Sequence, residues 1–129
     1  MATLRVDGGV DRMNHISTGK TGEQLALDYL LEKGYRLVEQ NWRCKLGEID
    51  LVMQDKDTLV FVEVKSRTSD QFGSPEEAIT PHKLKRMEKL AQYYLLQKHS
   101  SQDWQIDLAA IMLDKNNKTG KINHLKNIG

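Results

Sequence analysis

Residues 47–65 read GEIDLVMQDKDTLVFVEVK. Apolar and polar residues alternate toward both ends of this stretch, and its middle segment, residues 54–57, is entirely polar. Such alternation on either side of a short polar segment predicts a β-hairpin, because successive side chains of a strand point to opposite faces of the sheet. This stretch is the strongest local signal in the chain, and it indicates a fold built around an antiparallel pair of strands.

The register of this hairpin depends on the length of its turn. If the turn occupies residues 54–57, the expected opposed pairs are Met53–Thr58, Asp50–Phe61, Glu48–Glu63 and Leu46–Lys65. Opposed residues share a face of the sheet. The polar residues expected to project together are Glu48, Asp50, Glu63 and Lys65. The apolar residues expected on the other face are Ile49, Leu51, Val60, Val62 and Val64. A slip of one residue would separate Asp50 from Glu63.

The clustered acids indicate a divalent-metal site. Carboxylates on one patch repel one another, and a hard cation such as Mg2+ (or Mn2+) bound among Glu48, Asp50 and Glu63 would offset that repulsion. Lys65 could hold a phosphate or the attacking water during phosphodiester cleavage. The alternative is an ordinary solvated face of an antiparallel sheet, on which these residue types are common. Direct opposition of Glu48 and Glu63 favours the metal site, because a merely solvated surface avoids such pairs.

The rest of the chain adds helices and further strands. Thr18 or Thr21 can cap a first helix that ends near Gly34, and Thr80-Pro81 is a typical start for a second helix. Further strands are expected over residues 35–42, 106–113 and 121–125. The order α-β-β-β-α-β-β predicts an α/β fold in which helices flank a mixed β-sheet.

The composition is that of an ordinary globular protein, with 39% hydrophobic and 29% charged residues in a chain of 129. Residues 1–17 lack periodicity and are expected to form a flexible N-terminal arm, whereas residues 18–129 are expected to form a single domain. The one cysteine excludes an internal disulfide and a Cys-rich zinc site. No apolar run is long enough to span a membrane, and the N-terminus has no signal-peptide core, so we expect a cytoplasmic protein.

Basic residues mark candidate contacts with nucleic acid, although the net charge of +1 does not by itself indicate such a partner. Residues 80–100 carry five basic side chains against one acid, and the candidates for phosphate contact there are Lys83, Lys85 and Arg86. Ser66 and Arg67 follow the second hairpin strand and could also contact phosphates. For each of them the alternative is a solvated surface residue. Asp107, in a late strand, is expected to make a structural hydrogen bond, although it could support the site.

The acidic residues also carry a resemblance. Asp50, a gap of twelve residues and then Glu63-Val64-Lys65 resemble the signature of the restriction-endonuclease-like, or PD-(D/E)xK, nuclease superfamily. A longer set of motifs is similar to the YraN-like family and comprises Gly22-Glu23, Asn41-Trp42-Arg43, residues 47–52, 61–67 and 72–78, and the helix that carries Lys83. This resemblance spans about residues 17–125. It implies a restriction-endonuclease-like fold, Asp50 and Glu63 as metal ligands, Lys65 as catalytic lysine, and Glu23 as an accessory acid.

The YraN-like family is similar to archaeal-type Holliday junction resolvases. That similarity implies Mg2+- or Mn2+-dependent hydrolysis of DNA, including branched DNA, by a symmetric homodimer. Two alternatives remain open from the sequence. One is a catalytically silent module that keeps the nuclease fold and binds nucleic acid or a protein partner. The other is metal-dependent hydrolysis of RNA or small phosphates.

Overall fold

The computed structural model of this protein describes residues 2–5, 18–68, 73–114, 116 and 119–129. The helices in this part of the chain are α1 (Thr18–Glu32), the short 3-10 helix η2 (Pro75–Ala78) and α2 (Pro81–Gln97). The strands are β1 (Ala2–Arg5), β2 (Arg36–Cys44), β3 (Gly47–Asp55), β4 (Thr58–Thr68), β5 (Asp103–Leu113) and β6 (Thr119–Leu125). From α1 onward, the order of the α-helices and strands confirms the predicted α-β-β-β-α-β-β.

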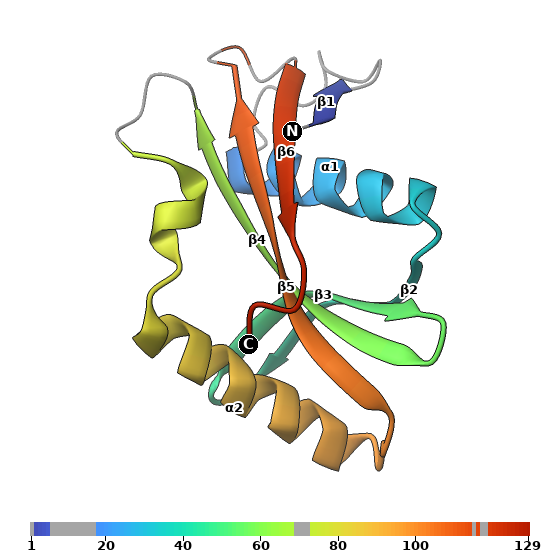
Figure 1. Ribbon diagram of the computed structural model, residues 1–129. Coiled ribbons are helices and arrows are strands. Elements are labelled where there is room, and N and C mark those ends of the chain that lie inside the picture. Colours follow the sequence, from blue (N-terminus) through green and yellow to red (C-terminus); the bar gives the residue numbers. More distant parts are fainter. Residues whose placement is uncertain (1, 6–17, 69–72, 115, 117–118) are drawn as a thin grey trace.

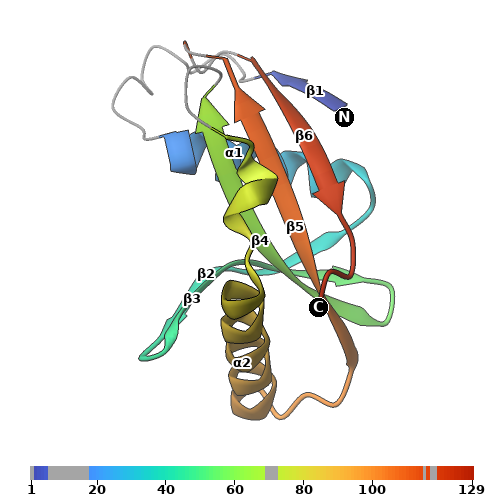
Figure 2. The same cartoon turned by 60° about the vertical axis from the view of Figure 1, so that its left-hand side comes forward.

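The strands form one six-stranded sheet in the order β1-β6-β5-β4-β3-β2. All neighbouring strands in it are antiparallel except β4 and β5, which run parallel. A parallel pair requires a crossover connection, and here α2 lies in that connection. The two long helices cover opposite faces of the sheet (Figure 1 and Figure 2). The predicted α/β class with a mixed sheet is therefore confirmed.

Each face of the sheet has its own hydrophobic core. The cluster under α1 includes Leu30, Leu51, Met53, Val60, Val62 and Ile111. The cluster under α2 includes Val52, Phe61, Leu90, Tyr94 and Ile106. The hairpin of β3 and β4 is therefore buried on both faces, whereas the alternation of its sequence predicted one polar and one apolar face. Its charged residues lie at the two ends of the hairpin, in the turn at residues 55–57 and where β3 and β4 separate.

The turn between β3 and β4 is tighter than predicted. Asp55 pairs with Thr58, so the turn contains two residues and the predicted register is wrong by two residues. Lys56 adopts φ +55°, as the two-residue hairpin turns that match the strand twist require, and its carbonyl accepts a hydrogen bond of 2.7 Å from the Gln54 side chain. Because an even shift preserves the side-chain faces of a strand, the shift by itself leaves the acidic grouping intact.

Beyond the hairpin, β3 separates from β4. The β3–β4 ladder ends at the pair Leu51–Val62, whereas β3 remains paired with β2 as far as Gly47. In Figure 2, β2 and this end of β3 extend away from β4 beside α2. Ile49 consequently packs in the cluster under α2, while Leu51 packs in the cluster under α1. This corrects the prediction that both residues share one face.

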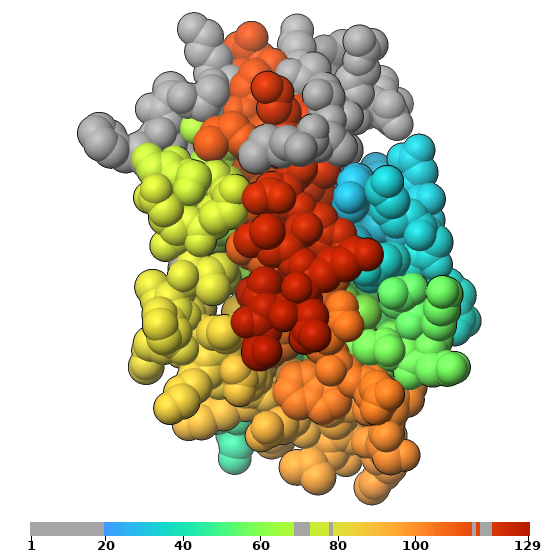
Figure 3. All heavy atoms as spheres, in the orientation of Figure 1, coloured from blue at the N-terminus to red at the C-terminus, as the bar shows by residue number. Residues whose placement is uncertain are grey.

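The N-terminal segment also differs from the prediction. Ala2–Arg5 was expected to belong to a flexible arm, but it forms β1 and pairs with β6. Backbone pairing with an edge strand requires no side-chain periodicity, which explains why the pattern missed it. The rest of the predicted arm, residues 6–17, lies outside the described residues. In the space-filling view, β6 crosses the middle of one face, between α1 and η2 (Figure 3). Among the described helices, none is both long and apolar enough to cross a membrane.

Candidate active site

Asp50 lies where β3 leaves β4. Its Oδ2 atom accepts a hydrogen bond of 2.8 Å from the backbone N–H of Val64. Val64 packs against the α1 cluster, so its neighbours Glu63 and Lys65 project toward the opposite face of β4. The hydrogen bond therefore holds the Asp50 carboxylate beside the segment of β4 that carries the other two predicted catalytic side chains.

The carboxyl group of Asp50 is strongly perturbed. Burial, followed by the charge of Glu63, raises the pKa of Asp50 from 3.8 to about 7. The Val64 hydrogen bond acts in the other direction because it stabilises the carboxylate, and the charges of Glu23 and Glu48 raise the pKa further. A proton or another cation is therefore favoured at this position near neutral pH.

Glu63 is perturbed in the same direction. Burial raises the pKa of Glu63, while the ammonium groups of Lys83 and Lys65 oppose that rise. The Lys83 Nζ atom, from α2, lies 3.8 Å from Glu63 Oε1. Two acids with raised pKa values thus lie together on adjacent strands, and basic groups surround them without fully compensating them.

Lys65 has the complementary shift. Burial and repulsion from Lys83 and Arg67 lower its pKa, although Glu63 and Asp50 oppose that change. An amine with a lowered pKa exchanges protons more readily near neutral pH than an ordinary lysine does. Arg67, two residues further along β4, projects to the same side and supplies positive charge next to this amine.

Glu23 reaches the site from the other layer of the fold. It lies in the second turn of α1, where its Oε1 atom accepts a hydrogen bond of 3.3 Å from the Gln40 side chain on β2. Its charge raises the pKa of Asp50, so the two carboxylates interact. The structure therefore places the predicted accessory acid near Asp50.

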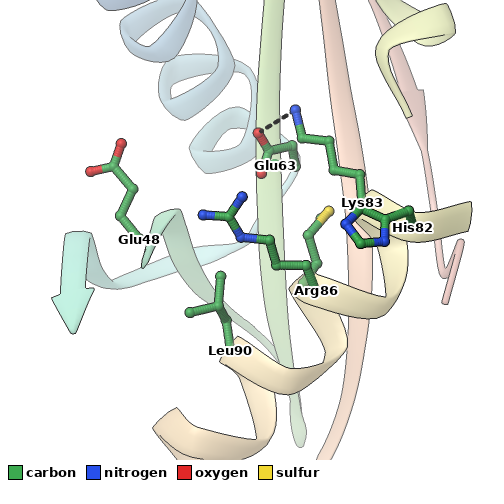
Figure 4. A pocket seen from close by; sticks show the side chains of 7 residues that line it. Glu48, Glu63, His82, Lys83, Arg86 and Leu90 are labelled. Carbon is green, nitrogen blue, oxygen red and sulfur yellow. Dashed lines mark ion pairs between the residues drawn. The ribbon is translucent and has the colours of Figure 1, made fainter. Parts of the chain in front are cut away.

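A cleft of about 390 Å³ opens between α2 and the ends of β3 and β4 (Figure 4). Its lining comprises Glu48, Glu63, His82, Lys83, Arg86, Met87 and Leu90. Lys83 and Arg86 project from one side of α2 toward the cleft, and the Arg86 guanidinium approaches Gly47 so closely that an added Cβ there would lie 3.3 Å from it. Lys85 is exposed on α2 and does not line this cleft. The cleft thus combines acids on the strands with cations on the helix.

Glu48 lies apart from the other acids. The predicted opposition of Glu48 and Glu63 is wrong, because Glu48 pairs with Arg43 on β2, and the two side chains form an ion pair of 3.0 Å. The register shift of two residues already places Glu63 at the level of Asp50 rather than Glu48. The separation of β3 from β4 then carries Glu48 toward the outer rim of the cleft (Figure 4). Glu48 still adds negative charge that raises the pKa of both Asp50 and Glu63.

Ser66 is turned away from the cleft. Its Oγ atom is buried and has no hydrogen-bond partner among the described residues, and a Cβ added to Gly22 of α1 would lie 1.7 Å from it. Ser66 follows Val64 by two residues and so shares its α1-facing side. The prediction that the Ser66 hydroxyl contacts a phosphate is therefore wrong, and the residue instead allows α1 to approach β4 closely.

The comparison with known proteins places this chain in a family. The model of the uncharacterised protein family UPF0102 matches residues 22–111. The chain belongs to UPF0102. A UPF0102 protein of Syntrophus aciditrophicus (strain SB) is 49% identical over 100 residues, which cover 77% of this chain and 79% of the relative. Another, from Caldicellulosiruptor bescii, is 41% identical over 117 residues, which cover 88% and 98% of the two chains. The predicted YraN-like membership is confirmed at this level.

The donor set of this UPF0102 chain fits a metal held by two carboxylates. Among the described residues, no group of three or more His, Cys, Asp and Glu side chains is arranged to hold an ion. Mg2+ is commonly bound by one or two carboxylates, with waters and substrate phosphates completing its shell. Asp50 and Glu63 match this pattern, since both are partly buried and both have raised pKa values. A cage that also includes Glu48 is not formed.

Asp107 is structural, as expected. Its carboxylate is fully buried and accepts hydrogen bonds from the side chain of Gln105 (2.9 Å) and the backbone of Asn127 (3.0 Å). His124 Nε2 lies 2.7 Å from its second oxygen. No local sequence pattern predicts this pairing, because the histidine and the aspartate lie seventeen residues apart on neighbouring strands. The Lys83–Glu63 pair and the Val64–Asp50 hydrogen bond were likewise not predicted.

Proposed function

We propose that this chain is a metal-dependent nuclease that hydrolyses phosphodiester bonds of DNA, with branched or otherwise structured DNA as its substrate. The main support is the convergence of Asp50, Glu63 and Lys65 at the point where β3 and β4 separate. Two partly buried acids that repel each other destabilise a fold, so their presence favours a functional reason over a structural one. A divalent cation held by Asp50 and Glu63 would supply that reason.

Each residue of the proposed site would have a distinct role. Bound Mg2+ or Mn2+ would polarise the phosphate and activate a water molecule. Asp50 and Glu63 would hold the ion through carboxylate oxygens, which hard cations prefer. Lys65 would take a proton from the attacking water in its neutral form, or stabilise charge on the phosphate in its ammonium form. Glu23, at the edge of the site, would orient that water as an accessory acid.

Basic residues around the cleft would hold the nucleic acid. Lys83 and Arg86 line the cleft, and Arg67 lies on the same side of β4 as Lys65. Each would contact a backbone phosphate, because such contacts position a duplex without reading its sequence. Lys85, exposed on α2 outside the cleft, would contact phosphates further along a long duplex. Ser66 is not part of this surface.

Resolution of a four-way DNA junction requires two active sites, because two strands must be cut in register. A homodimer with two-fold symmetry provides this arrangement. We therefore propose that the active species is a dimer, and sedimentation of the protein with and without four-way DNA measures it. A monomer in both conditions would contradict this part of the proposal.

A panel of DNA substrates tests the proposed activity. Purified protein is incubated with Mg2+ or Mn2+ and with linear, nicked, flapped and four-way DNA. Wild type should cleave at least one substrate, and Glu63→Gln and Lys65→Met should each lower the rate at least about 100-fold while the circular dichroism spectrum is unchanged. The control is Lys89→Met, which removes an exposed charge from α2 outside the cleft. A wild-type protein that is inert on every substrate with both metals would refute the proposal.

A second candidate is a module that binds nucleic acid without turnover. The observation that favours it is the Lys83–Glu63 ion pair, which partly neutralises the acids without any metal. This candidate predicts salt-dependent DNA binding that survives Glu63→Ala, together with no cleavage in any condition. Binding and cleavage measured on the same preparations separate the two functions.

A further inference from the structure

Lys83 occupies a constrained position on the first turn of α2. Thr80 caps this helix, and its hydroxyl accepts a hydrogen bond of 3.1 Å from the Lys83 backbone N–H. Pro81, at the first helical position, restricts the same turn. The backbone of residue 83 is therefore held in the first turn of α2, and its side chain is the part that can change partner.

The contact between Lys83 and Glu63 is an ion pair rather than a short hydrogen bond. The distance of 3.8 Å between Nζ and Oε1 exceeds the range of charge-assisted hydrogen bonds, which lie near 2.8 Å. The Lys83 side chain is 33% exposed and the Glu63 side chain 18% exposed, so the ammonium lies at the mouth of the cleft (Figure 4). A flexible lysine in such a contact can separate from its partner at little cost.

The charges around this ion pair favour transfer of the Lys83 ammonium to an anion once the pair separates. In the cleft Lys83 faces Glu63, Glu48, His82 and Arg86, and from β4 the ammonium of Lys65 repels it. A divalent cation bound by Glu63 and Asp50 would repel Lys83 as well. The nearest alternative partner for the ammonium is then an anion in the cleft, where Arg86 is already placed to attract one.

We propose that Lys83 is an exchangeable counter-cation: it pairs with Glu63 in the metal-free protein, and it transfers to a substrate phosphate when a divalent cation takes its place. This inference rests on the metal and DNA binding of the proposed nuclease site, and it adds a positioning role to that site. Lys83 and the metal compete for Glu63, so Lys83 weakens metal binding in the free protein. DNA phosphate removes Lys83 from that competition, so DNA and metal strengthen each other's binding through this residue.

Calorimetric titration with Mn2+ tests the exchange directly. Without DNA, Lys83→Gln should bind Mn2+ about fivefold more tightly than wild type, the size expected for loss of a partly exposed ion pair. Wild type should bind Mn2+ more tightly when uncleavable DNA is present, and Lys83→Gln should lose most of that gain. Lys89→Gln, which removes the same charge from an exposed site on α2, should behave as wild type in both titrations.

Each outcome decides the inference. If Mn2+ affinity in Lys83→Gln is equal to or weaker than that of wild type, or if Lys89→Gln shows the same gain, the exchange is refuted while the nuclease proposal stands. Tighter Mn2+ binding by Lys83→Gln with no DNA cleavage by wild type supports the exchange and refutes only the nuclease. Absence of Mn2+ binding in all three proteins, with and without DNA, overturns both.

Discussion

Replacement of Asp50 by asparagine should stabilise the folded protein at neutral and alkaline pH. In wild type the charged carboxylate is held partly buried beside Glu63, and these two causes raise the pKa of Asp50 to about 7. Asparagine removes the charge but keeps an oxygen that can accept the hydrogen bond from Val64, so the local geometry is preserved. The substitution therefore isolates the cost of ionising this one group in the fold.

The direction and size of the stability difference between Asp50→Asn and wild type follow from the pKa of Asp50 in the folded and unfolded states. A group whose pKa is raised on folding favours the folded state fully at pH values below its unfolded pKa, and this contribution is lost as the pH rises through the folded pKa. For Asp50 the interval runs from 3.8 to about 7. Since each pH unit corresponds to about 1.4 kcal/mol, ionisation should cost wild type at most about 4 kcal/mol by pH 8.

Urea unfolding in the presence of EDTA, from pH 4 to pH 8, measures this difference. Asp50→Asn should match wild type near pH 4 and exceed its free energy of unfolding by an amount that grows up to about 4 kcal/mol at pH 8. Asp57→Asn, in the exposed hairpin turn, is the matched control and should change stability by less than about 0.5 kcal/mol throughout. A difference between Asp50→Asn and wild type that does not grow with pH would refute the reasoning.

Substitutions at four further positions test the fold that positions the site. Gly22→Ala should lower the free energy of unfolding in urea by about 1–3 kcal/mol, because its Cβ would lie 1.7 Å from the buried Ser66 hydroxyl. Ser66→Ala should be neutral or stabilising, because it removes a buried hydroxyl that has no hydrogen-bond partner among the described residues, and it should leave DNA binding unchanged. Asp107→Ala should cost about 3–5 kcal/mol in the same assay, because it leaves His124 and two other donors without their acceptor, and Asp107→Asn should cost less. Thr80→Ala should lower stability by about 1 kcal/mol through loss of the α2 cap, and an unchanged melting temperature would contradict that assignment.

The elements of this fold were largely predictable because their signals are local. Thr80-Pro81 gave the start of α2, and the alternation in residues 47–65 gave both hairpin strands. The turn was predicted two residues too long because Lys56 adopts a positive φ that its residue type does not favour. The predicted grouping of Asp50 with Glu63 on one face does not depend on this register error, since an even shift leaves side chains on their original faces.

The parts of the site that the sequence missed depend on contacts between elements far apart in the chain. The separation of β3 from β4 leaves Glu48 in an ion pair with Arg43. No sequence pattern within β3 predicts this separation. The burial of Ser66 depends on how closely α1 approaches β4. Lys83 reaches Glu63 only because the crossover between β4 and β5 brings α2 across the ends of the strands. Packing determines these contacts, and local periodicity does not encode them.

The most direct test of the site is a Mn2+ titration of wild type, Asp50→Asn and Glu63→Gln, each bound to uncleavable DNA. If these two carboxylates hold the ion, wild type should bind Mn2+ and both variants should lose that binding while retaining their fold and their affinity for DNA. Equal Mn2+ affinity in all three proteins, or none in wild type, would contradict a metal centre between β3 and β4.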